Sequence, residues 1–430
     1  MIRFLLAGML PALALATTVD IAPVWPGHPV GFDLITHGGR QFVAFYNDQR
    51  QMTIASRKLS ASSWQFVQLP SELGWDSHNY VAMAIDREGY IHVSGNMHVV
   101  PLVYFRTAKP LDITTFERQS MTGKDEQRVT YPKWIRGPAG ELIFTYRDGR
   151  SGSGNQIYDV YDEKTRSWRR LLDNPLTDGQ GRMNAYLSGP VPGPDGYFHL
   201  VWTWRDTPDC ATNHDLSYAR SMDMVHWEKS GGEAFRLPIR VETAEVIDPV
   251  PVHGGMINGN TRIGFDSQKR VVVTYHKFDA RGNTQIYNAR REDGGWRIYQ
   301  ASDWNYRWDF SGGGSIVFDI THGAVHPAAA GRLRLEWSNV KYGSGIWELD
   351  EATLRVLGSA PAPEALPVNW KTESDFPEMR VRIKEDSGTP PPGVRYVLRW
   401  ETLDANRDRP RQPPLPAPSM LRVYEFRAGH

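Results

Sequence analysis

Cysteine is almost absent from this sequence, since Cys210 is the only one among 430 residues. A single thiol excludes an intrachain disulfide and a cysteine-rich zinc site. An excess of charge is absent too, because 49 basic and 49 acidic side chains give a formal net charge of zero. With neither a basic stripe nor an acidic tail, nucleic acid is not expected as a partner, and an anionic ligand would have to be bound by local charge.

Long apolar runs are also missing. The apolar stretch from Phe4 to Ala16 follows Met-Ile-Arg and is too short to span a bilayer. It has the form of a secretory signal with an A-x-A cleavage site at Ala14-Leu-Ala16. We therefore expect residues 1–16 to be a signal peptide, the mature chain to begin near Thr17, and the protein to be secreted or periplasmic without binding a membrane. No segment has a sustained period of 3.6 residues, which argues against a helical fold.

Turn-forming and aromatic residues are abundant, with 39 Gly, 30 Pro, 15 Trp and 18 Tyr. Seven times, a turn signal precedes a short apolar run that ends in an aromatic, a histidine or a group of polar residues, at spacings of roughly 50 to 70 residues. This recurrence is typical of propeller blades built from four strands each. The sequence predicts an all-β, seven-bladed β-propeller forming a single domain over residues 17–430. The seven runs are Phe42–Asp48, Ile91–His98, Leu142–Asp148, Phe198–Asp206, Val271–Lys277, Leu333–Asn339 and Tyr396–Trp400.

In a propeller, equivalent strand ends point to the same mouth, so distant residues can share a pocket. Four of the runs place His98, Arg147, Arg205 and His276 at such ends. A propeller commonly pairs strands from the two ends of its chain. We expect the segment 18–23 or the segment 421–426 to supply that closure.

Two histidines lie twenty residues apart, His78 in Trp75-Asp-Ser-His78-Asn79 and His98 at the end of Gly95-Asn-Met-His98. A single histidine is more often a buried side chain bonded to backbone carbonyls. Two histidines at blade mouths, each with an asparagine close by, favour a functional pair, with Asn79 as a substrate contact.

A tyrosine and an arginine form a second motif. Tyr131 precedes Pro132, and Arg147 follows sixteen residues after Tyr131, just before Asp148-Gly149. Proline restricts the residue before it, so Tyr131 is expected to be extended. Arg147 can hold a carboxylate in a bidentate fork. An ion pair between Arg147 and Asp148 that stabilises the turn is the alternative.

Three further loops carry polar residues that could contact a substrate or an ion. In the first loop, Arg205 stands one blade after Arg147, and Tyr186 precedes it. In the second, His276 and Lys277 could contact an anionic substrate, or they could be solvated loop residues. The loop at 304–308 could stack on sugar rings or pack between blades. The loop that follows Arg205 offers oxygen ligands and one imidazole, which would suit a calcium ion. The favoured explanation of these polar residues is an Asx-rich loop whose side chains bond to its own backbone. The calcium candidates are Asp209, Asn213, His214 and Asp215.

Over nearly the whole mature chain, these segments resemble the BNR-4 repeat family, whose relevant members are secreted polysaccharide lyases with seven-bladed propellers. They include ulvan lyases and rhamnose–glucuronate lyases that act on gum arabic side chains. The resemblance implies pocket roles for His78, His98, Tyr131 and Arg147, and substrate contacts for Tyr186 and Arg205. No organic cofactor and no catalytic metal are expected. Some ulvan lyases hold a structural zinc, which the single cysteine argues against here, and a structural Ca²⁺ stays a candidate.

The resemblance implies a carbon–oxygen lyase that removes the C5 proton of a glucuronate and cleaves the bond at C4 to rhamnose. Arg147, aided by His98, would neutralise the sugar carboxylate so that the enolate is stabilised. His78 and Tyr131 would be the base and acid, in an order that the sequence leaves open. We expect a monomer acting on the rhamnose–glucuronate side chains of gum arabic. The alternatives are an endo-acting ulvan lyase, a non-catalytic carbohydrate-binding propeller and a sialidase-like hydrolase.

Overall fold

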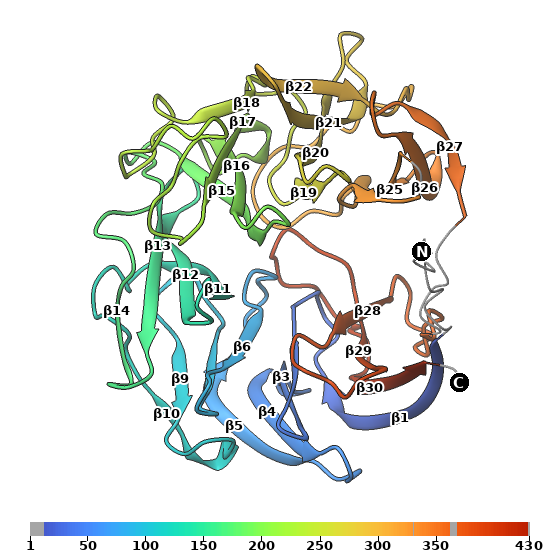
Figure 1. Ribbon diagram of the computed structural model, residues 1–430. Helices are drawn as coiled ribbons and strands as arrows, with labels where there is room; N and C mark the ends of the chain where they lie inside the picture. Colours follow the sequence, from blue (N-terminus) through green and yellow to red (C-terminus); the bar gives the residue numbers. More distant parts are fainter. Residues whose placement is uncertain (1–12, 330, 362–367, 429–430) are drawn as a thin grey trace, which may run out of the picture. The chain divides into compact units, whose positions relative to one another are not determined.

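The computed structural model describes residues 13–329, 331–361 and 368–428, and these are almost entirely β-structure (Figure 1). Thirty strands and two single-turn 3-10 helices account for the regular elements of this part of the chain. None of its helices is both long enough and apolar enough for a membrane span. The strands form seven sheets, in which antiparallel pairing of neighbouring strands predominates. This confirms the prediction of an all-β protein.

The chain divides into two compact units, of which unit 1 comprises Met1–His98, Val103–Ser120 and Pro363–His430. Unit 1 contains three sheets, in which neighbouring strands in sequence are mostly neighbours in space. The first sheet is β2 (Asp33–His37), β3 (Arg40–Tyr46), β4 (Gln51–Lys58) and β5 (Gln65–Glu72). The second is β6 (Val81–Ile85), β7 (Ile91–Gly95), β9 (Tyr104–Thr107) and β10 (Phe116–Arg118), with helix η1 (Ile113–Thr115) before β10. The third is β28 (Arg380–Glu385), β29 (Val394–Thr402), β30 (Ser419–Ala428) and β1 (Leu13–Val24).

Unit 2 comprises Val99–Leu102 and Met121–Ala362 and contains the other four sheets. One holds β8 (His98–Val100), β11 (Val129–Arg136), β12 (Leu142–Arg150), β13 (Ser153–Asp162) and β14 (Ser167–Arg170). The next holds β15 (Asn184–Pro192), β16 (Phe198–Arg205), β17 (Asn213–Ser221) and β18 (Glu245–Asp248), with η2 (Cys210–Thr212) before β17. The third sheet of unit 2 holds β19 (Arg262–Phe265), β20 (Val271–Phe278), β21 (Thr284–Glu292) and β22 (Gly295–Gln300). The fourth holds β23 (Ile320–His322), β24 (His326–Pro327), β25 (Arg332–Asn339), β26 (Gly343–Asp350) and β27 (Val356–Ala360).

The seven apolar runs of the sequence correspond to seven strands in seven different sheets, namely β3, β7, β12, β16, β20, β25 and β29. Each is an interior strand with a neighbour on both sides. Such strands are the ones that sheet packing buries most, and all eight residues of β16 are buried. One detail differs from the prediction, because β7 ends at Gly95 and His98 begins the separate strand β8. His98 is therefore not at the strand end equivalent to that of Arg205.

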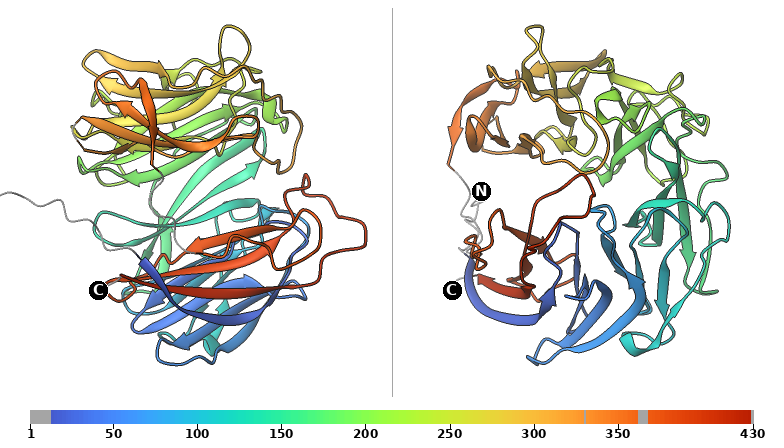
Figure 2. Two further views of the ribbon diagram at one scale, coloured as in Figure 1. Left: turned by 90° about the vertical axis from the view of Figure 1, so that its right-hand side faces the viewer. Right: turned by 180° about the vertical axis from the view of Figure 1, so that it is seen from behind.

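Both segments expected to close a ring lie side by side in unit 1. Strand β1 pairs with β30 so that Thr18 faces Tyr424 and Val19 faces Val423, as Figure 2 shows for the blue and dark red strands. The closed seven-bladed ring and the single domain over 17–430 stay predictions. Residues 1–12 of the predicted signal peptide lie outside the described residues, and 13–16 belong to β1.

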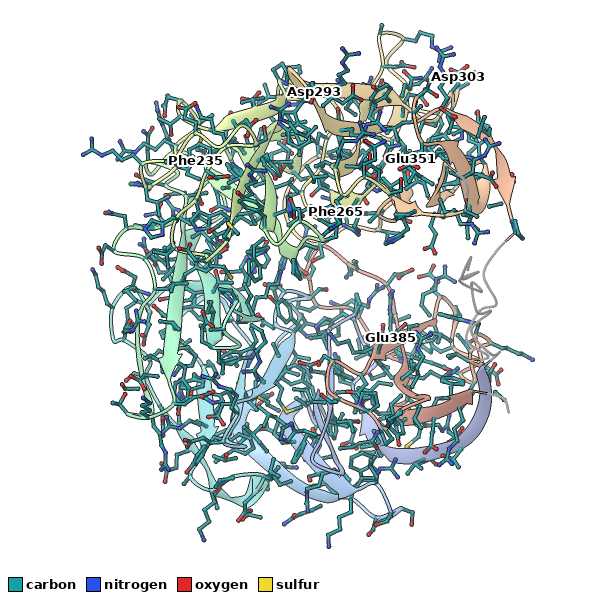
Figure 3. All side chains as sticks on the ribbon, viewed as in Figure 1. Phe235, Phe265, Asp293, Asp303, Glu351 and Glu385 are labelled. Carbon is teal, nitrogen blue, oxygen red and sulfur yellow. The ribbon has the colours of Figure 1, made fainter. Side chains whose placement is uncertain are left out.

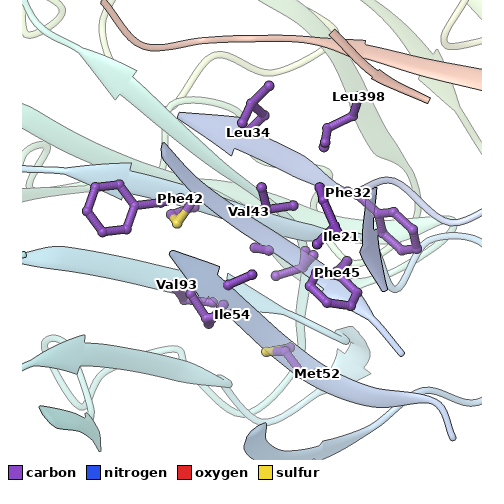
Figure 4. Close-up of a cluster of buried hydrophobic side chains, with 14 of the residues drawn as sticks. Ile21, Phe32, Leu34, Phe42, Val43, Phe45, Met52, Ile54, Val93 and Leu398 are labelled. Atoms are coloured by element: carbon purple, nitrogen blue, oxygen red, sulfur yellow. The ribbon is translucent and has the colours of Figure 1, made fainter. Parts of the chain in front are cut away.

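Within each unit, buried side chains fill the space between sheets, while acidic residues such as Asp293 and Asp303 point outward (Figure 3). In unit 1, Phe42, Val43 and Ile54 belong to one apolar cluster (Figure 4). Each fully buried side chain of this size contributes about 1.5–3 kcal/mol to stability.

Unit 2 buries aromatic rings in the loop at 304–308 that could have stacked on sugars. Trp304 is 7% exposed and Trp308 is 3% exposed. The ring of Trp304 stacks on Tyr342 with centroids 6.0 Å apart. The structure therefore favours packing as the role of this loop.

Candidate active site

In unit 1, His78 and His98 share one carboxylate, that of Asp76. The Nδ1 atom of His78 lies 2.7 Å from Asp76 Oδ1, and Nδ1 of His98 makes a short hydrogen bond to Asp76 Oδ2. The centroids of the two imidazole rings are 4.4 Å apart. We call Asp76, His78 and His98 the imidazole cluster. The chain thus brings the two predicted histidines together.

The loop between β5 and β6 aims His78 through a local turn. Asp76 Oδ1 accepts a hydrogen bond from the backbone N–H of His78 at 2.8 Å, and Asp76 O accepts one from Asn79 N at 3.1 Å. Aspartate commonly bonds to the backbone two residues later, which favours such turns. Before His98, Asn96 has a φ of +58°, a conformation that asparagine tolerates better than most residues. Its side chain donates to Ser71 Oγ and to Glu72 O, both at 2.8 Å, which holds that conformation.

Asp408 adds a second carboxylate to His78. Its Oδ2 lies 3.4 Å from His78 Nδ1, and its Oδ1 accepts the backbone N–H of Ser77 at 3.0 Å. Burial lowers the pKa of His78, but hydrogen bonds and charge from Asp408 and Asp76 outweigh burial and raise the pKa to about 9. Burial by itself would raise the pKa of the Asp76 carboxyl. The hydrogen bonds from His78 and His98 outweigh burial and hold this pKa well below its usual range. At neutral pH His78 is therefore a cation.

Among the described residues, the imidazole cluster is also the only group of three His, Cys, Asp or Glu side chains whose ligand atoms approach within 4.8 Å of one another. A zinc ion at about 2.1 Å from each ligand would hold two ligand atoms roughly 3.4 Å apart. The 2.7 Å between His78 and Asp76 is a direct hydrogen bond instead. The geometry therefore favours a hydrogen-bonded network over a metal centre.

In unit 2, the Arg147 guanidinium lies among two tyrosine rings. Its side chain is buried, with Nη2 donating to Thr130 Oγ1 at 3.1 Å and Nη1 to Tyr186 Oη at 3.4 Å. Its Cζ atom lies 4.9 Å from the Tyr131 ring centroid. Nε of Arg147 is buried without a hydrogen-bond partner among the described residues. Asp148 pairs with Arg128 at 3.3 Å, so the alternative ion pair with Arg147 is not the one observed.

Arg205 and Tyr186 complete this group, and we call Tyr131, Arg147, Tyr186 and Arg205 the arginine–tyrosine cluster. The Arg205 Cζ atom lies 5.3 Å from the Tyr186 ring centroid, and the rings of Tyr131 and Tyr186 are 6.1 Å apart. Ser151 Oγ lies 2.6 Å from Tyr186 Oη. Four predicted residues from two neighbouring sheets of unit 2 therefore lie together.

The backbone of Tyr131 differs from the prediction. Its φ is +60°, so the expectation of an extended residue before Pro132 is wrong. Strand β11 pairs Thr130 with Arg147 and Lys133 with Thr145, which leaves two residues of β11 opposite one of β12. This is a β-bulge, and the proline in it has no N–H for the ladder. A positive φ is rare outside glycine and tends to occur at functional sites.

Two other predicted contacts, His276 and Lys277, are occupied within unit 2. His276 has no exposed surface, accepts a hydrogen bond from Asn260 Nδ2 at 2.9 Å and stacks on Trp308. Lys277 Nζ pairs with Asp248 Oδ2 at 2.5 Å. Their positions fit a core histidine and an internal ion pair better than contacts to a sugar.

Asn79, also predicted as a contact, lies in unit 1. Its backbone carbonyl accepts the Tyr46 hydroxyl at 2.7 Å, and its own Oδ1 is buried without a partner among the described residues.

The residues suggested for calcium bond to groups of their own loop and of a neighbouring segment. Asp209 Oδ1 accepts the N–H groups of Ala211 at 2.9 Å and Gly312 at 2.6 Å. His214 lies between Asp206 at 2.9 Å and Asp215 at 3.0 Å. These contacts favour the Asx-rich loop, and the Ca²⁺ ion stays a prediction.

Sequence reasoning missed Asp76, Asp408, Thr130 and Ser151. Asp76 stands two residues before His78, a spacing that could have suggested the turn. Asp408 is separated from His78 by 330 residues and lies in a proline-rich region, so no local pattern marks it.

A family model described as "BNR repeat-containing family member" matches residues 40–304, which is more than half of the chain. No curated protein matches this chain. Among solved structures, polysaccharide lyase Uly1 is 13% identical, with a TM-score of 0.62 over 96% of this chain and 100% of that one.

An ulvan lyase of polysaccharide lyase family PL25 is 14% identical, with a TM-score of 0.59 over 96% of both chains. The same enzyme bound to -[GlcA(1-4)Rha3S]- gives a TM-score of 0.58 at 14% identity, again over 96% of both chains. Similarity at this level of identity concerns the fold. The chain thus belongs to the BNR repeat-containing family, and its fold is similar to that of polysaccharide lyases.

Proposed function

We propose that this protein is a polysaccharide lyase that cleaves the C4–O bond of a uronic acid by β-elimination. The observation that carries the proposal is the arginine–tyrosine cluster, in which the Arg147 guanidinium lies 4.9 Å from the Tyr131 ring centroid. A cation and a proton-transfer group side by side are what this elimination needs. The similarity in fold to polysaccharide lyases supports the same conclusion.

The buried Nε–H of Arg147 is the strongest sign of an anionic ligand. A buried donor without an acceptor is costly, so a native structure that keeps one needs a reason for it. A sugar carboxylate would accept this N–H and form a charge-assisted hydrogen bond. The C5 proton of a uronate is weakly acidic while the carboxylate carries its full charge. Neutralisation by Arg147 stabilises the enolate that forms when this proton leaves.

Tyr131 and His78 are the proposed proton-transfer groups. The nearby guanidinium stabilises negative charge on the Tyr131 phenol oxygen, which suits a base at C5. His78 carries a proton at neutral pH, because Asp76 and Asp408 raise its pKa to about 9 against the effect of burial. A protonated imidazole suits the acid that protonates the leaving oxygen at O4. Tyr186 and Arg205 are the proposed substrate contacts.

The proposed substrate is a glucuronate that carries rhamnose at O4, as in the side chains of gum arabic. An ulvan lyase activity has equal support, because a similar structure holds a glucuronate–rhamnose-3-sulfate repeat. Both polymers present the same uronate chemistry. They differ in sulfation and in whether the linkage lies within the main chain.

Incubation of the purified protein with gum arabic and with ulvan tests the proposal. Elimination creates an unsaturated uronate with a strong ultraviolet absorbance, whereas hydrolysis yields reducing ends without it. A non-catalytic binding protein yields neither. Rising absorbance that Tyr131→Phe abolishes is the expected result. Reducing ends without absorbance would refute a lyase, and the polymer that reacts would identify the substrate.

A further inference from the structure

The imidazole cluster distributes its carboxylates unevenly. His78 Nδ1 faces two of them, Asp76 at 2.7 Å and Asp408 at 3.4 Å. His98 Nδ1 faces Asp76 alone, through the carboxylate oxygen that His78 does not use. Both rings therefore contact Asp76 through Nδ1, but their electrostatic surroundings differ.

The contacts to Asp76 also define which ring nitrogen carries a proton. An ionised carboxylate only accepts hydrogen bonds, so each Nδ1 that it contacts must carry a hydrogen. A neutral imidazole with hydrogen on Nδ1 has its lone pair on Nε2. A neutral His98 with this hydrogen has an acceptor at Nε2, while a protonated His78 carries a hydrogen on Nε2 as well.

A charge on one imidazole ring disfavours a charge on the other. Their centroids are 4.4 Å apart, and two like charges this close disfavour double ionisation. The carboxylate of Asp408 offsets this repulsion at His78, and the other charged neighbours add no compensating negative charge. Burial, which outweighs the carboxylates, lowers the pKa of His28 to about 4 and keeps that ring neutral, and Arg50 is itself a cation. A positive charge is therefore favoured on the ring that Asp408 also faces, which is His78.

We propose that Asp76 is a positioning residue that fixes both imidazoles as Nδ1–H forms, and that Asp408 places the extra proton on His78. His78 is then a hydrogen-bond donor at Nε2, and His98 is an acceptor at Nε2. In catalysis, and only if the proposed lyase function holds, this assigns the acid to His78 and the base to Tyr131. Sequence reasoning left that order open.

Nitrogen-15 NMR of the imidazole rings in the full chain tests the charge assignment without any substrate. The two signals are assigned with His78→Gln and His98→Gln. In the wild type, His78 should be cationic at neutral pH and titrate well above a free imidazole, while His98 should carry a hydrogen on Nδ1. A His78 that titrates like a free imidazole, or a His98 protonated on Nε2 alone, would overturn the proposal. These two measurements need no carboxylate variant.

Two variants then separate the carboxylates. Asp408→Asn should lower the titration midpoint of His78 and leave the tautomer of His98 unchanged. Asp76→Asn should leave both rings as mixtures of the Nδ1–H and Nε2–H tautomers. The exposed His226 lies 2.6 Å from Asp223 and serves as an internal reference whose signals should not move. Equal effects of Asp408→Asn on both rings would contradict the proposal.

The pH dependence of elimination tests whether His78 acts as the general acid. An acid must be protonated to act, so activity should fall as pH rises through the pKa of His78, and Asp408→Asn should move this fall to lower pH. An unchanged alkaline limb would overturn the role of His78 as acid. If no glycan is cleaved by the wild type, the proposed function fails, while the NMR result still decides the charge assignment.

Discussion

The Arg147 guanidinium carbon lies 4.9 Å from the centre of the Tyr131 ring, and the hairpin of β11 and β12 creates this proximity. Thr130 faces Arg147 in the ladder, and the bulge that follows places Tyr131 in a left-handed conformation. A cation and a phenol separated by sixteen residues in sequence thus become neighbours through strand register.

Removal of the Tyr131 hydroxyl tests its role as base. Tyr131→Phe should lower kcat by about 10³-fold, within the range for a lost proton-transfer group, with an unchanged unfolding temperature. The matched control is Tyr197→Phe, since Tyr197 also lies under a guanidinium, that of Arg220 at 4.1 Å. The control should keep wild-type turnover on gum arabic or ulvan. Comparable turnover of both variants would remove Tyr131 from the mechanism.

Arg147→Lys keeps the charge but removes the planar fork that can hold a carboxylate while bonded to Thr130 and Tyr186. We expect kcat/KM to fall by about 10²–10³-fold. Steady-state kinetics on whichever of gum arabic and ulvan the wild type cleaves provide the measurement. Arg128→Lys, at an arginine whose side chain is 61% exposed and paired with Asp148, is the control and should be near wild type. If Arg147→Lys matched it, bidentate carboxylate binding would be wrong.

His276 should make the fold sensitive to acid. Burial, followed by the charge of His322, lowers the pKa of His276 to about 3. The unfolded state binds a proton near pH 6.5 and the folded state does not, so stability is present above pH 6.5 and falls as pH drops toward 3. Between pH 7 and pH 5 this one group accounts for about 2 kcal/mol. Urea unfolding of His276→Gln should show a correspondingly smaller decrease in the free energy of unfolding between pH 7 and pH 5.

A control for His276 is available on the surface. The side chain of His226 is 87% exposed, and His226→Gln should leave the acid dependence of unfolding unchanged. Because His276 has no exposed surface, we also expect His276→Gln to retain turnover. A specific rise in KM would restore the sequence-based prediction that His276 contacts substrate.

His78 should act in the opposite direction on stability. The carboxylates of Asp408 and Asp76, working against burial, raise its pKa to about 9. Its contribution is therefore complete below pH 6.5 and is lost as pH rises through about 9. Thermal unfolding between neutral and alkaline pH should show this loss in the wild type and much less of it in His78→Gln. Identical alkaline profiles would mean that the ion pairs contribute nothing to folding.

The interior strands could be predicted from the sequence because sheet neighbours and packing bury both of their faces. The run Val271–Lys277 lies within β20 in this way. Outer strands such as β22, in which no residue is fully buried, have a composition that carries little signal. Register, and with it the bulge at Tyr131, depends on pairing across the hairpin rather than on the local preference of a residue before proline.

The candidate site was predictable where its residues follow the repeat and not where they come from distant loops. Tyr186 and Arg205 recur one blade after Tyr131 and Arg147, and the cluster brings all four together. Asp408 reaches His78 across 330 residues, and only the folded chain shows this contact. His276 occupied an equivalent strand position, but its burial depends on Trp308 and Asn260, which the repeat pattern does not include.

The pairing of β1 with β30 has a consequence for biosynthesis. Strand β30 begins at Ser419, so the sheet that holds β1 can be completed only after the segment from Ser419 to Ala428 has left the ribosome. Until then, the edge of β1 that β30 will cover is open to other strands or to a chaperone. A nascent chain truncated before Ser419 should therefore stay sensitive to protease in unit 1, whereas the released full-length chain should resist it.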